Sequence, residues 1–238
     1  TLDPFLSQVR DFARGDYQVA LSKGAALSDA ERDAVSEKLH MYTGLGVQYL
    51  KDANLRVNPS RFRKELLRGE HLTMGRYDAR FEGVDSDAAG ENPETDPSDT
   101  AISGAFTAAF NDYLVRELHY SSDVPYKVSA GAIRVWDWKH KVPGSMRPVP
   151  LPIMVDDLGY AMRENPHLKV LSANGWFDLA TPFFATEYDL AHLGLDAKLR
   201  NNVSFTYYPS GHMVYLNVDA LKQFKSDLAK FYDSAAPR

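Results

Sequence analysis

The sequence predicts an α/β protein in which a parallel sheet follows a helical region. From about residue 150 onward, short strand-like segments alternate with amphipathic helical segments, which is the pattern of parallel strands covered by helices. Before residue 80, helix-capping signals punctuate the amphipathic runs, and no convincing strand pattern occurs. The 238 residues, 44% of them hydrophobic, are enough to bury a substantial core.

Capping signals define the helices of the first region. Ser28-Asp-Ala-Glu31 has the spacing of a capping box and predicts the start of a helix. Asn58-Pro59 combines a cap with a first-turn proline, and it predicts a further helix that Gly69 ends. An amphipathic run also opens the chain. We therefore expect residues 1–84 to form a helical lid or cap region.

Residues 85–100 are predicted to be an acidic surface loop. Carboxylates alternate there with glycine and proline, a composition that cannot pack a core. The acidic residues are Asp85, Asp87, Glu91, Glu94, Asp96 and Asp99. So many carboxylates raise calcium binding as an alternative, but the D-x-[DN]-x-[DN]-G spacing of a calcium loop is absent. We expect a solvated loop.

Residues 101–238 are expected to form the core. A long helix with a buried apolar stripe is predicted at its start, because apolar residues recur there at helical spacing. The stripe consists of Ile102, Phe106, Phe110, Tyr113, Leu114 and Leu118. A later helix should stop at Asn165-Pro166, where the proline cannot continue it.

The remaining elements of the core alternate between strand and helix. Strands are expected over Leu168–Ala173 and Val203–Tyr208. Thr181-Pro182 should open a helix that Gly194 closes, and Asn217 should cap a final amphipathic helix. This order predicts a parallel sheet with helices on both faces.

An aspartate and a histidine follow the two predicted strands. Asp178 lies in the loop A-N-G-W-F-D and His212 in the loop S-G-H-M. Because functional groups gather at the carboxyl ends of strands in open α/β sheets, we expect the two side chains to meet. Aspartate before histidine is the order that ends a Ser…Asp…His triad. The structural alternative is that Asp178 caps the helix near Pro182 while His212 fills a polar turn.

No nucleophile accompanies this pair in the sequence. The G-x-S-x-G frame does not occur, and the serines nearest to glycine, Ser103, Ser129 and Ser210, lack it. Cysteine is absent, which excludes a thiolate nucleophile, disulfides and thiolate metal sites. The chain therefore carries an orienting acid and a general base without the serine that they would serve.

Composition argues against several other functions. The net charge is −5 and the 27 Lys and Arg are scattered, which argues against nucleic-acid binding. The apolar runs are shorter than the roughly 20 residues that cross a bilayer, so no membrane role is expected. No H-E-x-x-H-type spacing occurs, so no catalytic metal and no cofactor are expected. The histidines outside the S-G-H-M loop are His40, His71, His119, His140, His167 and His192.

The two reactive loops carry a family resemblance. Asn174-Gly-x-x-Asp178-Leu-x-x-Pro182, followed by Gly211-His-Met213 and a terminal amphipathic helix, resembles the C-terminal part of the serine carboxypeptidase family. These α/β-hydrolases remove residues from peptide C-termini. Gly75-Arg-Tyr-Asp-Ala-Arg-Phe81, Asn111-Asp-Tyr-Leu114 and Asn165-Pro-His-Leu168 are similar to a cysteine-free bacterial branch. The resemblance covers most of the chain and is weakest near its start.

The resemblance implies the C-terminal part of an α/β-hydrolase sheet with a helical lid. It implies that Asp178 is the triad acid and His212 the triad histidine. It also implies that Met213 helps to line the pocket for the departing residue. The family's serine, oxyanion-hole donors and carboxylate-binding groups lie in a half that this chain does not match. A serine-type carboxypeptidase acting on a peptide substrate therefore needs an N-terminal segment or chain carrying the nucleophilic serine.

Two expectations follow from that missing half. The chain alone should be inactive, because orienting groups without a nucleophile or oxyanion donors retain little of the effect of a triad. The chain begins at Thr1 without a methionine, so the natural N-terminus is expected to lie elsewhere. Family members usually work outside the cytoplasm, which implies a periplasmic or secreted protein.

Other residues are candidates for supporting roles. Trp176 is favoured to line an acceptor pocket because it lies in the Asp178 loop, with core packing as the alternative. Arg76 and Arg80 flank Asp78, and we interpret them as a structural ion-pair cluster between lid and core. Binding of a substrate carboxylate by these arginines is the alternative.

Two other functions fit the same residues. An esterase or acyltransferase on the same scaffold would turn over esters with blocked C-termini, whereas a carboxypeptidase requires a free terminal carboxylate. A non-catalytic binding module lacking the nucleophile half would have a native chain that begins at Thr1.

Overall fold

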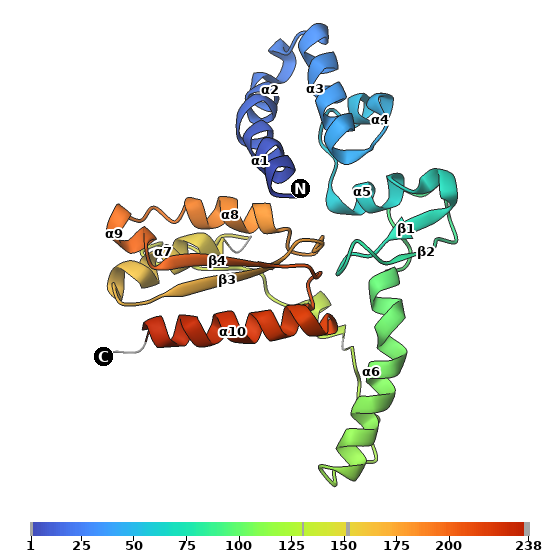
Figure 1. The fold of residues 1–238 in the computed structure, drawn as a ribbon, viewed down its shortest axis with the longest axis vertical. Coiled ribbons are helices and arrows are strands. Elements are labelled where there is room, and N and C mark those ends of the chain that lie inside the picture. The colour runs from blue at the N-terminus through green and yellow to red at the C-terminus, as the bar shows by residue number, and fades with distance from the viewer. Residues whose placement is uncertain (1, 130, 151–152, 236–238) are drawn as a thin grey trace. The chain divides into compact units, whose positions relative to one another are not determined.

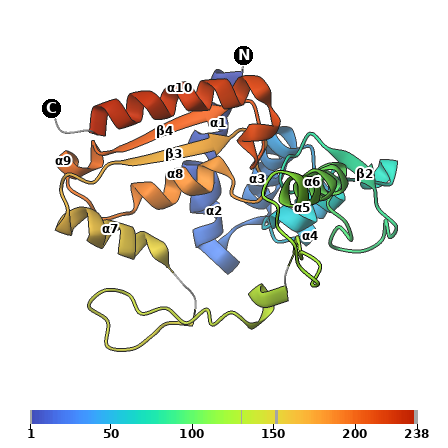
Figure 2. The ribbon, with the colours of Figure 1, turned by 90° about the horizontal axis from the view of Figure 1, so that it is seen from below.

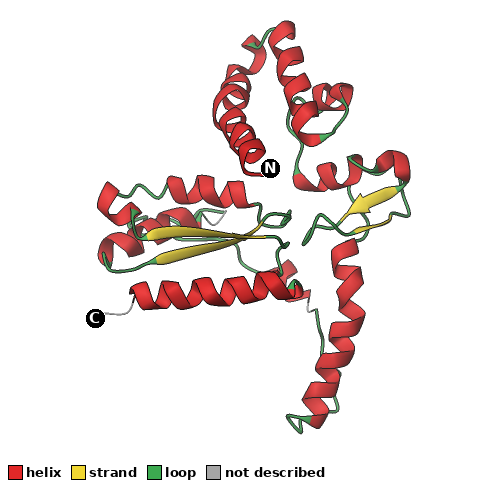
Figure 3. Ribbon diagram, in the orientation of Figure 1, coloured by secondary structure: helices red, strands yellow, loops and turns green. Residues whose placement is uncertain are grey.

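The computed structural model describes residues 2–129, 131–150 and 153–235. They fall into two compact units, Thr1–Pro97 and Ser98–Arg238. Each unit combines helices with one two-stranded sheet (Figure 3). Among the helices of the described ranges, none combines the length and the apolar character that a membrane span requires.

The first unit consists of short helices followed by a β-hairpin (Figure 1). The predicted capping box is present, because the Ser28 side chain accepts from the Glu31 N–H and the Glu31 carboxylate accepts from the Ser28 N–H. Asn58 caps the next predicted helix, but that helix ends at Glu65 rather than at Gly69. The elements are α1 (Leu2–Phe12), α2 (Gln18–Lys23), α3 (Asp29–Thr43), α4 (Val47–Asp52), α5 (Pro59–Glu65), β1 (Leu72–Met74) and β2 (Glu82–Val84).

The hairpin of β1 and β2 contradicts the expectation that no strand occurs before residue 80. The strands pair antiparallel from Leu72↔Val84 to Met74↔Glu82. The turn between them is closed by a hydrogen bond of 2.8 Å from the Gly75 N–H to the carbonyl of Phe81. Strands of three residues are too short to show the alternation that sequence analysis uses.

The core of the first unit lies between α1, α2, α3 and the segment that follows α4. Its buried members are Phe12, Ala20, Leu27, Val35 and Leu55. Leu55 adopts a φ of 62°, a left-handed conformation that costs a non-glycine residue roughly 1–3 kcal/mol. The Tyr17 hydroxyl donates to its carbonyl at 2.5 Å, and burial raises the pKa of that tyrosine. Tertiary packing therefore holds this strained residue in place.

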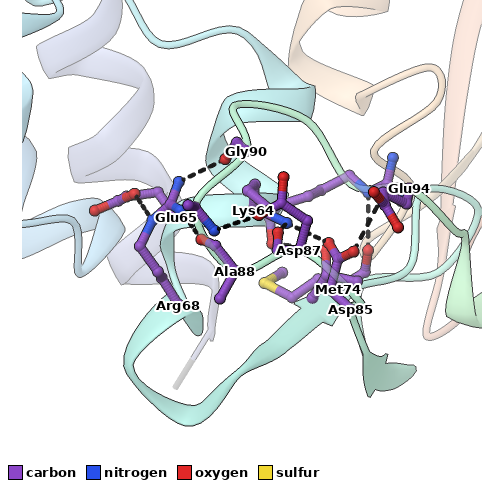
Figure 4. Close-up of polar contacts among 12 residues, drawn as sticks. Lys64, Glu65, Arg68, Met74, Asp85, Asp87, Ala88, Gly90 and Glu94 are labelled. Carbon is purple, nitrogen blue, oxygen red and sulfur yellow. Dashed lines mark hydrogen bonds and ion pairs between the residues drawn. The ribbon is translucent and has the colours of Figure 1, made fainter.

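A buried ion pair attaches the acidic segment to α5. Lys64 Nζ lies 2.7 Å from Asp85 Oδ2, and the two side chains are only 1% and 2% exposed. Lys64 also donates to the carbonyl of Asp87, and Asp85 Oδ1 accepts from the Glu94 N–H at 3.4 Å (Figure 4). The segment is therefore not the uniformly solvated loop that its composition indicated.

Arg68 makes a second attachment beside the first. Its guanidinium donates to the carbonyls of Ala88 and Gly90, and Nε pairs with Glu65 Oε2 (Figure 4). Cations from the end of α5 and the turn after it thus hold the backbone of the acidic segment.

The second unit contains a parallel strand pair with helices on both faces. β3 (Val170–Gly175) and β4 (Val203–Tyr208) pair in parallel along their whole lengths. α8 lies along one face of this pair and α10 along the other (Figures 1 and 2). The described residues therefore have the predicted mixture of helices and parallel strands. Each of their sheets has two strands, and an α/β-hydrolase sheet stays a prediction.

Most elements of the second unit lie close to their predicted positions. β4 has the predicted bounds, whereas β3 begins at Val170 rather than at Leu168. Asn217 Oδ1 accepts from the N–H groups of Asp219 and Ala220 and caps the last helix, as predicted. The helices are α6 (Pro97–Arg116), α7 (Met154–Glu164), α8 (Phe183–Ala191), α9 (Ala197–Arg200) and α10 (Val218–Ala235).

The side chains of the strand pair alternate between the two helical layers. Val170 and Val203 pack in a cluster with the fully buried Met162 of α7. Tyr208, also fully buried, packs edge-on against Phe224 of α10 at a centroid distance of 5.4 Å. Burial raises the pKa of Tyr208. The end of β4 is thereby fixed to α10.

The long helix α6 differs from its prediction in burial. Its helical spacing was predicted correctly, but Phe106, Phe110 and Tyr113 are 45%, 39% and 49% exposed. With Tyr126 they border a hollow of about 480 Å³. Periodicity reports which residues share a face of a helix and does not report whether that face is covered.

Lys64→Met should lower the free energy of unfolding by about 3–5 kcal/mol, because it leaves the carboxylate of Asp85 buried without its cation. Lys64→Met combined with Asp85→Leu should recover most of that loss. Lys51→Met, which breaks a more exposed pair with Asp33, is the matched control and should cost much less. Guanidinium denaturation followed by circular dichroism measures all three. Equal stability of the two single variants would contradict the role of the buried pair.

Acid should release the acidic segment. Burial raises the pKa of Asp85, but hydrogen bonds from Lys64 and the Glu94 N–H outweigh this effect, and the pKa lies below its ordinary value. A depressed folded-state pKa adds stability above the unfolded value of about 3.9. That stability is lost as pH falls through the folded-state pKa.

Amide hydrogen exchange checks this pH dependence. Protection factors in segment 85–96 should fall below about pH 4, and should fall further than those of α3. Segment protection that stayed parallel to that of α3 down to pH 2 would refute the assignment.

Candidate functional site

Asp178 and His212 meet beyond the carboxyl ends of the two parallel strands. Asp178 follows β3 and His212 follows β4, and His212 Nδ1 lies 2.9 Å from Asp178 Oδ2. The aspartate side chain is 6% exposed, whereas the histidine side chain is 40% exposed. The pair thus combines a buried carboxylate with a partly accessible imidazole.

Gly175 lets the two loops approach each other. A Cβ at this position would lie 2.3 Å from the carbonyl oxygen of Gly211 and 2.5 Å from that of Ser210. Both distances are far below van der Waals contact, so any side chain would force the loops apart. The Phe177 N–H donates to the Ser210 carbonyl at 3.1 Å and joins the loops directly. The glycine of the A-N-G-W-F-D loop therefore has a steric role.

The carboxylate of Asp178 is held by the start of the segment that leads into α8. Oδ1 accepts from the N–H groups of Ala180 at 2.7 Å and Thr181 at 2.9 Å. Oδ2 accepts from the Thr181 hydroxyl at 2.7 Å. Asp178 therefore closes a turn ahead of α8 and also contacts His212, whereas the N-cap position of α8 is Pro182 and carries no side-chain cap, so the structural alternative of a helix cap is not observed. The same contacts that shape the turn orient the carboxylate.

The geometry fixes which ring nitrogen can act as a base. An ionised carboxylate can only accept hydrogen bonds, so Nδ1 of His212 donates and Nε2 becomes the basic nitrogen. The hydroxyl of Thr181 lies 3.1 Å from the same Nδ1. From the sequence, Thr181 was expected only to open a helix with Pro182, and its contact with Asp178 was not predicted. Its position three residues after an aspartate and directly before a proline is a local signal for such a turn.

The two predicted substrate-binding residues, Trp176 and Met213, are partly buried. They lie close in sequence to the Asp178–His212 pair, which we call the dyad. Trp176 stacks on Tyr207 at a centroid distance of 4.5 Å and meets Phe183 edge-on at 5.0 Å. Met213 directly follows His212 and precedes a 3₁₀ turn. The stacking of Trp176 fits the core-packing alternative, and pocket roles for both residues stay predictions.

Ser210 does not complete a triad in this structure. Its side chain is 1% exposed, and its hydroxyl donates to the carbonyl of Gly211 at 3.2 Å. Ser103 lies within α6, where its carbonyl accepts from the hydroxyl of Thr107. The hydroxyl of Ser210 is buried, so this loop presents no accessible serine beside Asp178 and His212.

The arginines of the β1–β2 turn have separate contacts within the first unit. Arg80 forms a two-pronged pair with the buried Asp78, with distances of 2.9 Å and 2.6 Å, and this hydrogen bonding raises its pKa. The guanidinium of Arg76 lies over the ring of Tyr77, and the backbone N–H of Arg76 donates to the Asp96 carboxylate. The predicted ion pair of Arg80 with Asp78 is therefore present, the placement of the cluster between lid and core stays a prediction, and carboxylate binding by these arginines stays an open alternative.

No group of three or more His, Asp or Glu in the described ranges is arranged to hold a metal ion. His140 Nε2 instead lies 2.8 Å from Asp157 Oδ2 at the start of α7.

Comparison of the chain with protein-family models, with curated proteins and with solved structures found no match. The carboxypeptidase resemblance therefore depends on the quoted motifs.

Gly175→Ala should separate the two loops and destabilise the unit by about 1–3 kcal/mol, because the added Cβ overlaps two carbonyl oxygens. The His212 Nδ1–H signal in proton NMR should shift upfield as its bond to Asp178 lengthens. Gly104→Ala is the matched control, since nothing lies within 4 Å of its Cβ and alanine favours a helix. An unchanged histidine signal in Gly175→Ala would show that the close approach does not position the dyad.

Proposed function

We propose that this chain supplies the acid and the general base of a serine carboxypeptidase of the α/β-hydrolase type. The nucleophilic serine belongs to an N-terminal segment or chain outside this sequence. The observation that carries the proposal is the contact between Asp178 and His212 at the carboxyl ends of neighbouring parallel strands. This is the place at which α/β proteins of this class gather catalytic groups.

The geometry supports a defined role for each residue in the proposed reaction. The serine hydroxyl attacks the last peptide carbonyl while Nε2 of His212 accepts its proton. His212 then returns that proton to the departing amine, and water hydrolyses the acyl-enzyme by the same relay. Asp178 holds the ring through Nδ1 and stabilises its charged form, and Thr181 holds Asp178.

The sheet also supports a partner segment. β3 and β4 pair only with each other in the described part of the chain, so each leaves one edge without a strand neighbour. Parallel sheets usually contain several strands with both faces covered, and open strand edges invite pairing. Strands from the serine-bearing segment would extend this sheet and bring the nucleophile to its carboxyl end.

The first test combines intact mass and N-terminal sequencing of native material with labelling by a fluorophosphonate probe, which reacts with activated serines. The proposal expects the label on a segment or polypeptide outside residues 1–238. Native material consisting of this chain alone, without label, would contradict the proposal and favour the binding module.

In protein that labels, Asp178→Asn should lower kcat by about 10⁴-fold, because the ring loses its correct tautomer. His212→Ala should abolish labelling. Asp189→Asn, at an exposed position of α8, is the matched control and should leave kcat unchanged. Hydrolysis is measured with acyl-dipeptides that carry free or blocked C-termini. Equal turnover of the two would favour the esterase or acyltransferase instead.

A further inference from the structure

The first unit contains a pocket that the proposed function does not use. Its volume is about 540 Å³, within the range of roughly 300–1,000 Å³ that small-molecule sites occupy. Ala20 and Leu21 of α2 line it together with Leu27 and Leu55. Three of these four side chains belong to the buried core of the unit, so the wall that they form is apolar and fixed.

Two arginines line the same pocket, and none of the residues around it is acidic. Arg32 belongs to α3, and its neighbours Glu31 and Asp33 are already paired with Lys23 and Lys51 respectively.

Arg56 follows α4. Its guanidinium reaches the carbonyls of Asn54 at 3.3 Å and Leu21 at 3.5 Å, which are weak contacts for a cation. The pocket therefore combines an apolar wall with two guanidinium groups, neither of which forms an ion pair within 4 Å with a carboxylate of the described residues, although Asp29 lies one helical turn before Arg32.

The backbone beside the pocket is strained at Leu55, whereas Asn54, at the end of α4, is of a residue type that adopts this conformation readily. Asn54 and Leu55 adopt φ values of 51° and 62°, and both line the pocket. Left-handed conformations at non-glycine residues cluster at ligand sites, where the surrounding structure holds them. Here the Tyr17 hydroxyl and the burial of Leu55 maintain the conformation that places Arg56 at the pocket.

We propose that this pocket binds a small amphipathic carboxylate, with the apolar tail against Leu27 and Leu55 and the carboxylate between Arg32 and Arg56. Guanidinium groups match carboxylate geometry and bind it through charge-assisted hydrogen bonds. A neutral apolar molecule would leave both arginines without a counter-charge, and a bare anion would leave the apolar wall uncovered. The head and the tail are therefore both required.

Free fatty acids and the C-terminal residues of apolar peptides share this chemistry, so the test uses a probe for each. The full chain is titrated with octanoate and with N-acetyl-leucine, and amide shifts are followed by ¹H–¹⁵N NMR. At least one probe should bind saturably, with the largest shifts at Arg32 and Leu55. 1-Octanol and acetate carry the tail and the head alone, and each should bind at least tenfold more weakly.

Variants locate the site. Arg32→Gln and Arg56→Gln should each weaken the binding roughly tenfold or more, because each removes a charge-assisted hydrogen bond. Arg61→Gln removes the same charge from the same unit at a surface pair with Glu91, and it should bind like the unaltered chain. Ala25→Trp fills the pocket and should abolish binding while circular dichroism stays unchanged.

Weaker probe binding by Arg32→Gln and by Arg56→Gln, with unchanged binding by Arg61→Gln, supports the site. The proposal would be overturned if octanoate and 1-octanol bound with equal affinity. It would also be overturned if the pocket variants left the amide shifts caused by the probes unaltered. Neither result depends on hydrolysis, so this test is separate from that of the proposed carboxypeptidase.

Discussion

The close approach of two backbone loops at Gly175 is the constraint on which the candidate site depends. Parallel pairing in register sets Gly175 beside Tyr208, so the two strands end at the same level. The loops that follow can then touch only if the first residue to meet the second loop has no Cβ. Asp178 and His212 are brought within hydrogen-bonding distance by this backbone arrangement, and the Tyr208 contact with α10 anchors one side of it.

Local signals allowed the sequence to predict much of the fold. The caps at Ser28, Asn58 and Asn217 lie where they were expected, because a cap is formed by residues within three or four positions of one another. The hairpin was missed because three residues cannot display an alternating pattern. The Lys64–Asp85 pair was missed for a different reason, since its partners lie far apart in sequence and each alone has the composition of a surface residue.

The sequence predicted the two polar side chains of the site, Asp178 and His212, better than it predicted the residues that hold them in place. Asp178 and His212 stand after recognisable strands, so strand direction predicts that they lie at the same end of the sheet. Thr181 and the N–H group of Ala180 hold the carboxylate, and only the three-dimensional turn shows that both point at it. The steric requirement at Gly175 involves the second loop and cannot be derived from the first loop by itself.

Two of the ion pairs in the described part of the chain, Lys64–Asp85 and His212–Asp178, differ in the exposure of the partner of the carboxylate. In the Lys64–Asp85 pair both side chains are buried, which suits a contact that only fixes structure. In the Asp178–His212 pair the carboxylate is buried and satisfied by neighbouring donors, while the imidazole remains 40% exposed. An accessible ring of this kind can accept a proton from outside the pair. The Arg80–Asp78 pair, with side chains 42% and 7% exposed, has the same asymmetry, so exposure alone does not separate the two kinds of pair. The difference lies in the chemistry of the partner, because an imidazole can both give and take a proton whereas a guanidinium keeps its proton, and this supports the role proposed for His212.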